Sequence, residues 1–127
     1  MARPRAKDLT ERELEVMHVF WNCGQLTVAE VRDELSAAGR ELAYTTVATL
    51  TRILSEKGAL EQTNEERPFQ FRAIRSFEEV SGSLLGDLLQ RVFGGSREQL
   101  LITLIDQKRL SAKERAVLKD LLEEQQQ

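Results

Sequence analysis

Residues 43–72 read AYTTVATLTRILSEKGALEQTNEERPFQFR, and the spacing of the apolar residues changes halfway through this stretch. In the first half they recur every three or four positions, which predicts a helix over about residues 43–57. The second half predicts two strands, residues 60–63 and 69–72, joined by a turn rich in helix breakers. The inward face of the predicted helix consists of Val47, Leu50 and Leu54.

Two more helices are predicted before this stretch. Each begins at a threonine that is followed three residues later by a glutamate, at Thr10 and Thr27, which is the spacing of a capping box. Gly24 and Gly39 end these helices, because glycine tolerates the left-handed backbone common at helix C-termini. Three helices followed by a two-stranded β wing predict a mainly α fold, a winged helix-turn-helix, over residues 1–75.

Helical spacing returns in residues 76–127, where three further S/T-x-x-E/Q starts occur. Apolar residues there cover more than one helix face, and a segment this short cannot enclose them by itself. We expect a second copy of the chain to cover them, which makes residues 76–127 a helical dimerisation domain. The alternative is that these helices fold back onto the first domain. The residues expected at the interface are Leu84, Leu88, Leu101, Leu104, Ile105, Leu118 and Leu121.

The composition limits the classes of protein and of partner. The chain of 127 residues is 41% hydrophobic and has no apolar run of the roughly 18 residues that a membrane span needs. Its first residues lack the apolar core of a secretory signal, so we expect a cytoplasmic protein with no membrane partner. The net charge is −3, with 11 basic and 12 acidic side chains in residues 1–75. Binding of DNA must therefore depend on local clusters of positive charge.

The outward face of the helix predicted at about residues 43–57 carries short hydroxyl and methyl groups and one arginine. Such a surface suits the major groove, because threonine can bind base edges or a thymine methyl, and arginine can bind guanine or phosphate. We expect this helix to read double-stranded DNA; the alternative is a solvated face with one threonine as the helix cap. The expected DNA-binding residues of this helix are Tyr44, Thr45, Thr46, Thr49 and Arg52.

Two other segments carry cations that could contact DNA. Arg67 is the only cation in the predicted wing turn, but the two glutamates beside it would repel phosphate. The N-terminal arm holds Arg3, Arg5 and Lys7 without an acid among its first seven residues. It could follow a phosphate strand or a minor groove, and a solubilising arm is the alternative.

No group of residues predicts catalysis or metal binding. His18, the only histidine, has no second histidine or cysteine at ligand spacing, and we expect it to be a partly buried packing residue. Cys23, the only cysteine, can form no internal disulfide and has no His–Asp arrangement to activate it. We therefore predict no enzyme activity, no bound metal and no cofactor.

Several stretches of the sequence together resemble one known family. They are LTERELEVM (9–17), Trp21, LTVAEV (26–31), AYTTVATL (43–50), LSEKG (54–58), FR (71–72) and FGGS (93–96). In these stretches, which span nearly the whole chain, the sequence is similar to the BlaI/MecI/CopY penicillinase-repressor family. The run AYTTV at this distance after LTE is the most specific of them.

The resemblance implies a transcriptional repressor that binds an inverted-repeat operator, often around a TACA/TGTA core. It also implies a homodimer with winged helix-turn-helix heads and entwined C-terminal helices. The five residues named above for the third helix match the recognition-helix pattern of the family. The regulated genes, the inducing signal and an upstream sensor that could deliver it are not identified by the sequence.

Two features of family members are missing here. Staphylococcal-type members are cut at an Asn–Phe bond in the dimerisation helices, and the corresponding bond in this chain is Thr103–Leu104. The copper-responsive branch has a cysteine-rich C-terminal tail, whereas this chain ends in glutamines. The resemblance therefore supports neither release by that cleavage nor copper or zinc sensing through such a tail.

Two alternatives to a DNA-binding repressor stay open at this point. One is a winged-helix module that binds protein instead of DNA, which the acidic balance favours. The other is a regulator that senses a small molecule in a pocket between the leucine-rich helices. Salt-dependent binding to a palindromic duplex separates the first from a repressor, and ligand-dependent loss of DNA affinity supports the second.

Overall fold

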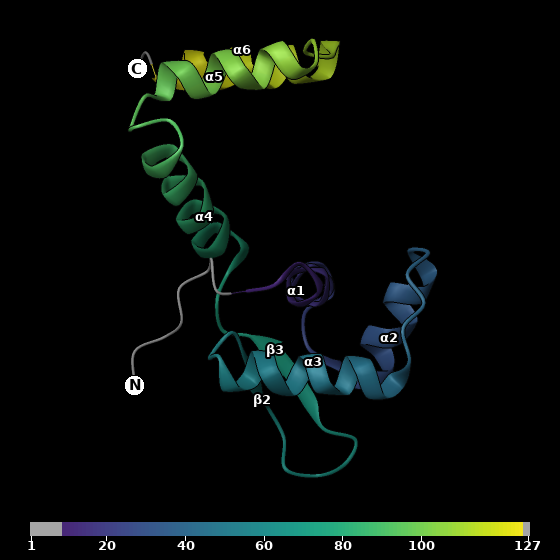
Figure 1. The fold of residues 1–127 in the computed structure, drawn as a ribbon. Coiled ribbons are helices and arrows are strands. Elements are labelled where there is room, and N and C mark those ends of the chain that lie inside the picture. The colour runs from purple at the N-terminus through teal and green to yellow at the C-terminus, as the bar shows by residue number, and fades with distance from the viewer. Residues whose placement is uncertain (1–8, 126–127) are drawn as a thin grey trace. The chain divides into compact units, whose positions relative to one another are not determined.

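The computed structural model describes residues 9–125, which form six α-helices and three short β-strands (Figure 1). The predicted mainly α fold, with three helices before a β ribbon and further helices after it, is confirmed. No described helix is both long and apolar enough to cross a membrane. The elements are α1 (Glu11–Cys23), β1 (Leu26–Thr27), α2 (Val28–Ala37), α3 (Tyr44–Glu56), β2 (Leu60–Gln62), β3 (Gln70–Ala73), α4 (Phe77–Arg91), α5 (Arg97–Gln107) and α6 (Ala112–Gln125).

Five of the six helices begin where the sequence pattern predicts. At each of them a threonine or serine oxygen accepts a hydrogen bond from the backbone N–H three residues later, at 3.0–3.2 Å. In α6 the backbone N–H of Ser111 also donates to Glu114, which holds the pKa of that carboxyl below its ordinary value. The capping residues are Thr10, Thr27, Ser76, Ser96 and Ser111.

A third strand, β1, joins the two predicted ones in an antiparallel sheet with the order β1-β3-β2. Leu26 pairs with Phe71 and Thr27 with Gln70. Two residues are too few to show a strand period in the sequence, and Thr27 also carries the capping signal of α2. The pairing of β1 depends on contact with β3, which lies far away in the sequence. The sheet therefore has three strands, where the sequence predicted a ribbon of two.

The hydrophobic core lies among α1, α2, α3, the sheet and the beginning of α4. Its completely buried members include Met17, Leu54 and Val80, which come from three different helices. Removing a core aliphatic side chain of this kind costs about 2–5 kcal/mol. The buried apolar residues are Leu9, Val16, Met17, Phe20, Leu26, Val31, Leu35, Val47, Leu54, Ala59, Leu60 and Val80.

The chain divides into two compact units, Met1–Leu85 and Gly86–Gln127, which we call the N-terminal and C-terminal units. The division falls within α4, later than the boundary expected between residues 75 and 76. The reason is that Val80 is buried in the first core and Leu84 packs against it. Phe77 also lies edge-on to Trp21, with ring centres 5.6 Å apart.

An ion pair joins the first turn of α1 to the end of α3. The carboxylate of Glu13, of which 2% is exposed, lies 2.5 and 2.9 Å from the Nζ of Lys57. Glu13 also completes the capping box of α1 with Thr10. Because both carboxylate oxygens are bound inside the protein, the Lys57 ammonium compensates a charge that water cannot reach.

We expect Lys57→Met to lower the free energy of unfolding by roughly 3 kcal/mol, because it leaves a buried carboxylate without its cation. The matched control is Arg40→Met, which breaks an exposed pair between Arg40 and Glu15 on the same helix α1. Exposed pairs contribute about 0–1 kcal/mol. Urea unfolding of both variants measures the difference. Equal losses in the free energy of unfolding would show that the buried Glu13 pair contributes no more to stability than the exposed pair.

Candidate nucleic-acid interface

Helix α3 packs with one face and leaves the other open to solvent. Val47, Thr51 and Leu54 are buried, and Leu50 is half-buried beside them. The outward side chains form what we call the reading face. They are the exposed Tyr44, Thr45, Thr49 and Arg52 and the half-buried Thr46 and Ala48.

Thr51 is a buried polar residue that the sequence pattern did not single out. Its hydroxyl donates to the carbonyl of Val47 at 2.8 Å, one turn earlier in α3. This bond satisfies the hydroxyl within the helix, so the residue packs inward together with its apolar neighbours. Its spacing of four residues from Val47 and three from Leu54 is the signal in the sequence that could have placed it on the inward face.

The first turn of α3 differs from that of the other described helices. Its N-cap residue is Ala43, and within the described residues no side chain caps its free N–H groups. It also has no acidic residue in its first turn, whereas the five other helices have at least one each. Free N–H groups and the helix dipole favour an anion at such a terminus.

Two contacts modify the charge of the reading face. Arg52 pairs with Glu56 one turn later at 2.8 Å, and both side chains are well exposed. Such a pair opens at little cost in free energy. Arg32 of α2 lies over the ring of Tyr44, with its Cζ 5.8 Å from the ring centre. This cation beside the start of α3 was missed, because the sequence does not show which residues of α2 lie near α3.

The wing consists of β2, β3 and the connecting residues 63–69, and one side chain organises its turn. Asn64 donates to the carbonyls of Glu66 and Pro68 at 3.0 and 3.2 Å, and its Oδ1 accepts from the N–H of Gln70 at 2.8 Å. Arg67 lies with its Cζ 5.5 Å from the centre of the Phe69 ring. The Arg67 side chain therefore packs along the wing.

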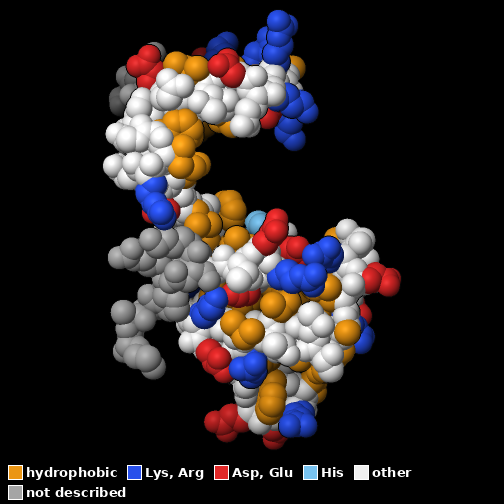
Figure 2. All heavy atoms as spheres, viewed as in Figure 1, with side chains coloured by type: hydrophobic (Ala, Val, Ile, Leu, Met, Phe, Trp, Pro, Cys, Tyr) orange, Lys and Arg blue, Asp and Glu red, His pale blue; other side chains and the backbone are white. Residues whose placement is uncertain are grey.

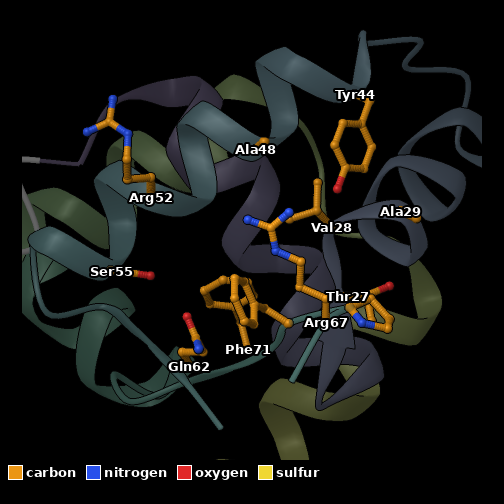
Figure 3. A pocket seen from close by; sticks show the side chains of 12 residues that line it. Thr27, Val28, Ala29, Tyr44, Ala48, Arg52, Ser55, Gln62, Arg67 and Phe71 are labelled. Carbon is orange, nitrogen blue, oxygen red and sulfur yellow. The ribbon is translucent and has the colours of Figure 1, made fainter. Parts of the chain in front are cut away.

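A cavity of about 740 Å³ lies between α3 and the wing, and we call it the wing cavity (Figure 3). The reading face contributes Tyr44, Ala48 and Arg52 to its lining, and the wing contributes Arg67 and Phe69. On the face of the N-terminal unit seen in Figure 2, apolar side chains lie exposed between basic and acidic ones. The other lining residues are Thr27, Val28, Ala29, Ser55, Gln62, Pro68 and Phe71.

Comparison with known proteins identifies the family. Residues 9–124, nearly all of the chain, match the penicillinase repressor family. This chain belongs to the penicillinase repressor family. The resemblance inferred from the sequence is thus confirmed, and the family is one of transcriptional repressors.

Individual family members are similar over most of their length. The transcriptional regulator BlaI of Mycobacterium tuberculosis is 32% identical over 118 residues, which cover 91% of this chain and 83% of that protein. The penicillinase repressor of Bacillus licheniformis is 28% identical over 116 residues, covering 91% of this chain and 90% of that one. The solved DNA-binding domain of the repressor BlaI is 28% identical, with a TM-score of 0.52, and covers 61% of this chain and 93% of that domain. The winged helix of this repressor is therefore a DNA-binding fold.

The remaining residues predicted at sites fall into three groups. The arm residues Arg3, Arg5 and Lys7 lie outside the described part of the chain. Leu84 is half-buried and packs against the core of the N-terminal unit. The other predicted interface residues are all exposed in the single chain, namely Leu88, Leu101, Leu104, Ile105, Leu118 and Leu121.

The expectation that His18 is partly buried is wrong. Its ring is exposed and lies edge-on to Trp21, with ring centres 5.2 Å apart. Cys23 is also exposed. Among residues 9–125, no group of three or more His, Cys, Asp or Glu side chains is arranged to hold a metal ion.

We expect Asn64→Ala to loosen the wing turn without unfolding the repressor. The variant removes three hydrogen bonds to backbone groups, each worth about 1 kcal/mol. Amide hydrogen exchange should be faster at Gln70, whose N–H loses its partner, and unchanged at Met17 in the core. Asn22→Ala, at an exposed position of α1, serves as the control. Unchanged protection at Gln70 in Asn64→Ala would contradict the role given to Asn64.

Proposed function

We propose that this repressor binds an inverted-repeat operator as a homodimer and reads its sequence with the reading face of α3. The observation that carries the proposal is the open face of α3, with its uncapped and acid-free first turn, on a fold similar to the BlaI DNA-binding domain. Threonine hydroxyls and methyls suit base edges, and Arg52 suits guanine or phosphate. A repressor of this kind acts in the cytoplasm, where the DNA of a bacterial cell lies.

Positioning on the duplex calls for phosphate contacts, and several groups close to the reading face are suited to make them. The free N–H groups at the start of α3 suit a phosphate oxygen, and Arg32 adds a cation beside Tyr44. Arg67 could reach a phosphate from the wing. Arg3, Arg5 and Lys7 remain candidates for contacts along the backbone or in the minor groove.

The homodimer is proposed from the exposed apolar residues of the C-terminal unit. Leu101, Leu104 and Leu121 are each more than half exposed in the single chain. Burial of apolar area is worth roughly 25 cal/mol per Å², so a second copy covering these residues would be stabilised strongly. A two-fold dimer presents two copies of α3, which matches the symmetry of an inverted repeat.

A protein-binding winged-helix module is the second candidate, and the net charge of −3 favours it. The two candidates differ in their response to salt. Fluorescence anisotropy with a TACA/TGTA palindrome, a scrambled duplex and increasing salt tests them directly. A repressor prefers the palindrome and loses affinity steeply as salt rises, because phosphate contacts release counterions. Equal and weak binding to both duplexes would favour the protein-binding module or a different operator.

We expect Thr46→Ala and Arg52→Ala each to weaken operator binding by about 1–3 kcal/mol for each interaction with a base edge that the substitution removes. Neither should unfold the protein, since alanine favours helix and the Arg52 pair is exposed. Anisotropy measures the affinity, and thermal unfolding checks the fold. Arg12→Ala on the exposed side of α1 is the control. Full operator affinity in a folded Thr46→Ala, Arg52→Ala double variant would refute the assignment of the reading face.

We expect a Leu101→Lys, Leu104→Lys double variant to be monomeric and to bind the operator far more weakly. Two charges in an apolar interface oppose association, and a monomer engages only one half-site at a time. Light scattering measures the mass, and anisotropy measures the affinity. Gln99→Lys on the opposite side of α5 is the control. A double variant that keeps the mass of a dimer would contradict the proposed interface.

A further inference from the structure

The wing cavity combines apolar walls with positive charge. Its 12 lining residues include two arginines and no aspartate or glutamate, although the chain as a whole carries a net charge of −3. Phe69, Phe71 and Val28 supply apolar surface. A volume of about 740 Å³ lies within the range of roughly 300–1,000 Å³ that small-molecule sites occupy.

Arg67 is the cation placed to meet a ligand in this cavity. Figure 3 shows its guanidinium in the middle of the lining residues, whereas the guanidinium of Arg52 points away from them. Arg52 is paired with Glu56. Among the described residues Arg67 forms no ion pair, and it lies over the ring of Phe69. A carboxylate at Arg67 would therefore pair with a guanidinium that forms no ion pair among the described residues.

The side chains around Arg67 suit an aromatic ring. Phe69 lies against the Arg67 guanidinium, Phe71 lines the same cavity, and the hydroxyl end of Tyr44 points toward it (Figure 3). A flat ring can stack on Phe69 or Phe71 and receive a hydrogen bond from Tyr44 at a polar substituent. Apolar walls with a few convergent polar groups are typical of small-molecule sites.

We propose that the wing cavity binds a small aromatic carboxylate, and that this ligand and operator DNA exclude each other. The second part rests on the proposed function, because Tyr44, Arg52 and Arg67 belong to both the cavity lining and the proposed DNA interface. A ligand that binds only the DNA-free repressor lowers operator affinity by mass action. The cavity lies between α3 and the wing, which differs from the pocket between leucine-rich helices considered from the sequence.

The first experiment measures binding to the DNA-free full chain by isothermal titration calorimetry, with 2-naphthoate as the probe. We expect one site per chain. The neutral 2-naphthamide has the ring without the charge, and acetate has the charge without the ring. Each should bind at least tenfold more weakly than 2-naphthoate. Equal binding of naphthoate and naphthamide would overturn the role of Arg67, and equal binding of acetate would reduce the site to a simple anion site.

Variants locate the site within the chain. Ala29→Leu fills the cavity from α2, and Ala37→Leu adds the same side chain at the exposed end of that helix, outside the lining. We expect Ala29→Leu to weaken naphthoate binding at least tenfold and Ala37→Leu to leave it unchanged. Arg67→Gln should remove the preference for naphthoate over naphthamide. Unchanged binding in a folded Ala29→Leu variant would place the ligand elsewhere and overturn the proposal.

The second experiment measures operator affinity by anisotropy while 2-naphthoate is added. The apparent Kd for DNA should rise in proportion to ligand concentration in the wild type and stay constant in Ala29→Leu. If the Kd for DNA stays constant in the wild type although calorimetry shows ligand binding, the proposed mutual exclusion is wrong. The ligand site itself would still be supported. If the chain binds no duplex at all, the proposed function fails and the exclusion fails with it, while calorimetry still decides whether the site exists.

Discussion

The pairing of β1 with β3 is the interaction on which the arrangement of the N-terminal unit depends. Leu26 and Thr27 pair with Phe71 and Gln70, so the residues that start α2 are held against the wing. Thr27 also caps α2 through its side chain, and one residue thereby sets both the sheet edge and the helix start. Thr27 and Phe71 line the wing cavity together with residues of α3. The pairing therefore brings the start of α2 to the space between the wing and α3.

Burial divides the charged residues of this repressor into two kinds. Glu13 and Lys57 form a pair that joins α1 to the end of α3, and removal of Lys57 leaves the buried Glu13 carboxylate without this cation. The Arg52–Glu56 pair on the reading face is exposed and exchanges partners readily. A stable framework and an adaptable surface therefore lie on the same helix. The low net charge of the chain is compatible with DNA binding, because contacts depend on the local groups at α3 and the wing.

The N-terminal and C-terminal units differ in how far their apolar side chains are buried. The N-terminal unit encloses its own core, including the first half of α4. In the C-terminal unit the large apolar side chains of α5 and α6 remain exposed in the single chain. The leucine-rich sequence predicted this unmatched surface, but it could not separate Leu84, which packs inward, from Leu88, which does not. Both have the same residue type and helical spacing, and only the neighbouring core distinguishes them.

The sequence by itself determined the helix starts, the order of the elements, the outward face of α3 and the family. These features follow from local physics: a capping serine or threonine acts within four residues, and helical spacing repeats every turn. Only the tertiary structure decided the strand β1, the inward hydroxyl of Thr51, the extent of the first core into α4 and the wing cavity. Each of these depends on residues far apart in the chain, whose contacts arise when the helices and strands pack together.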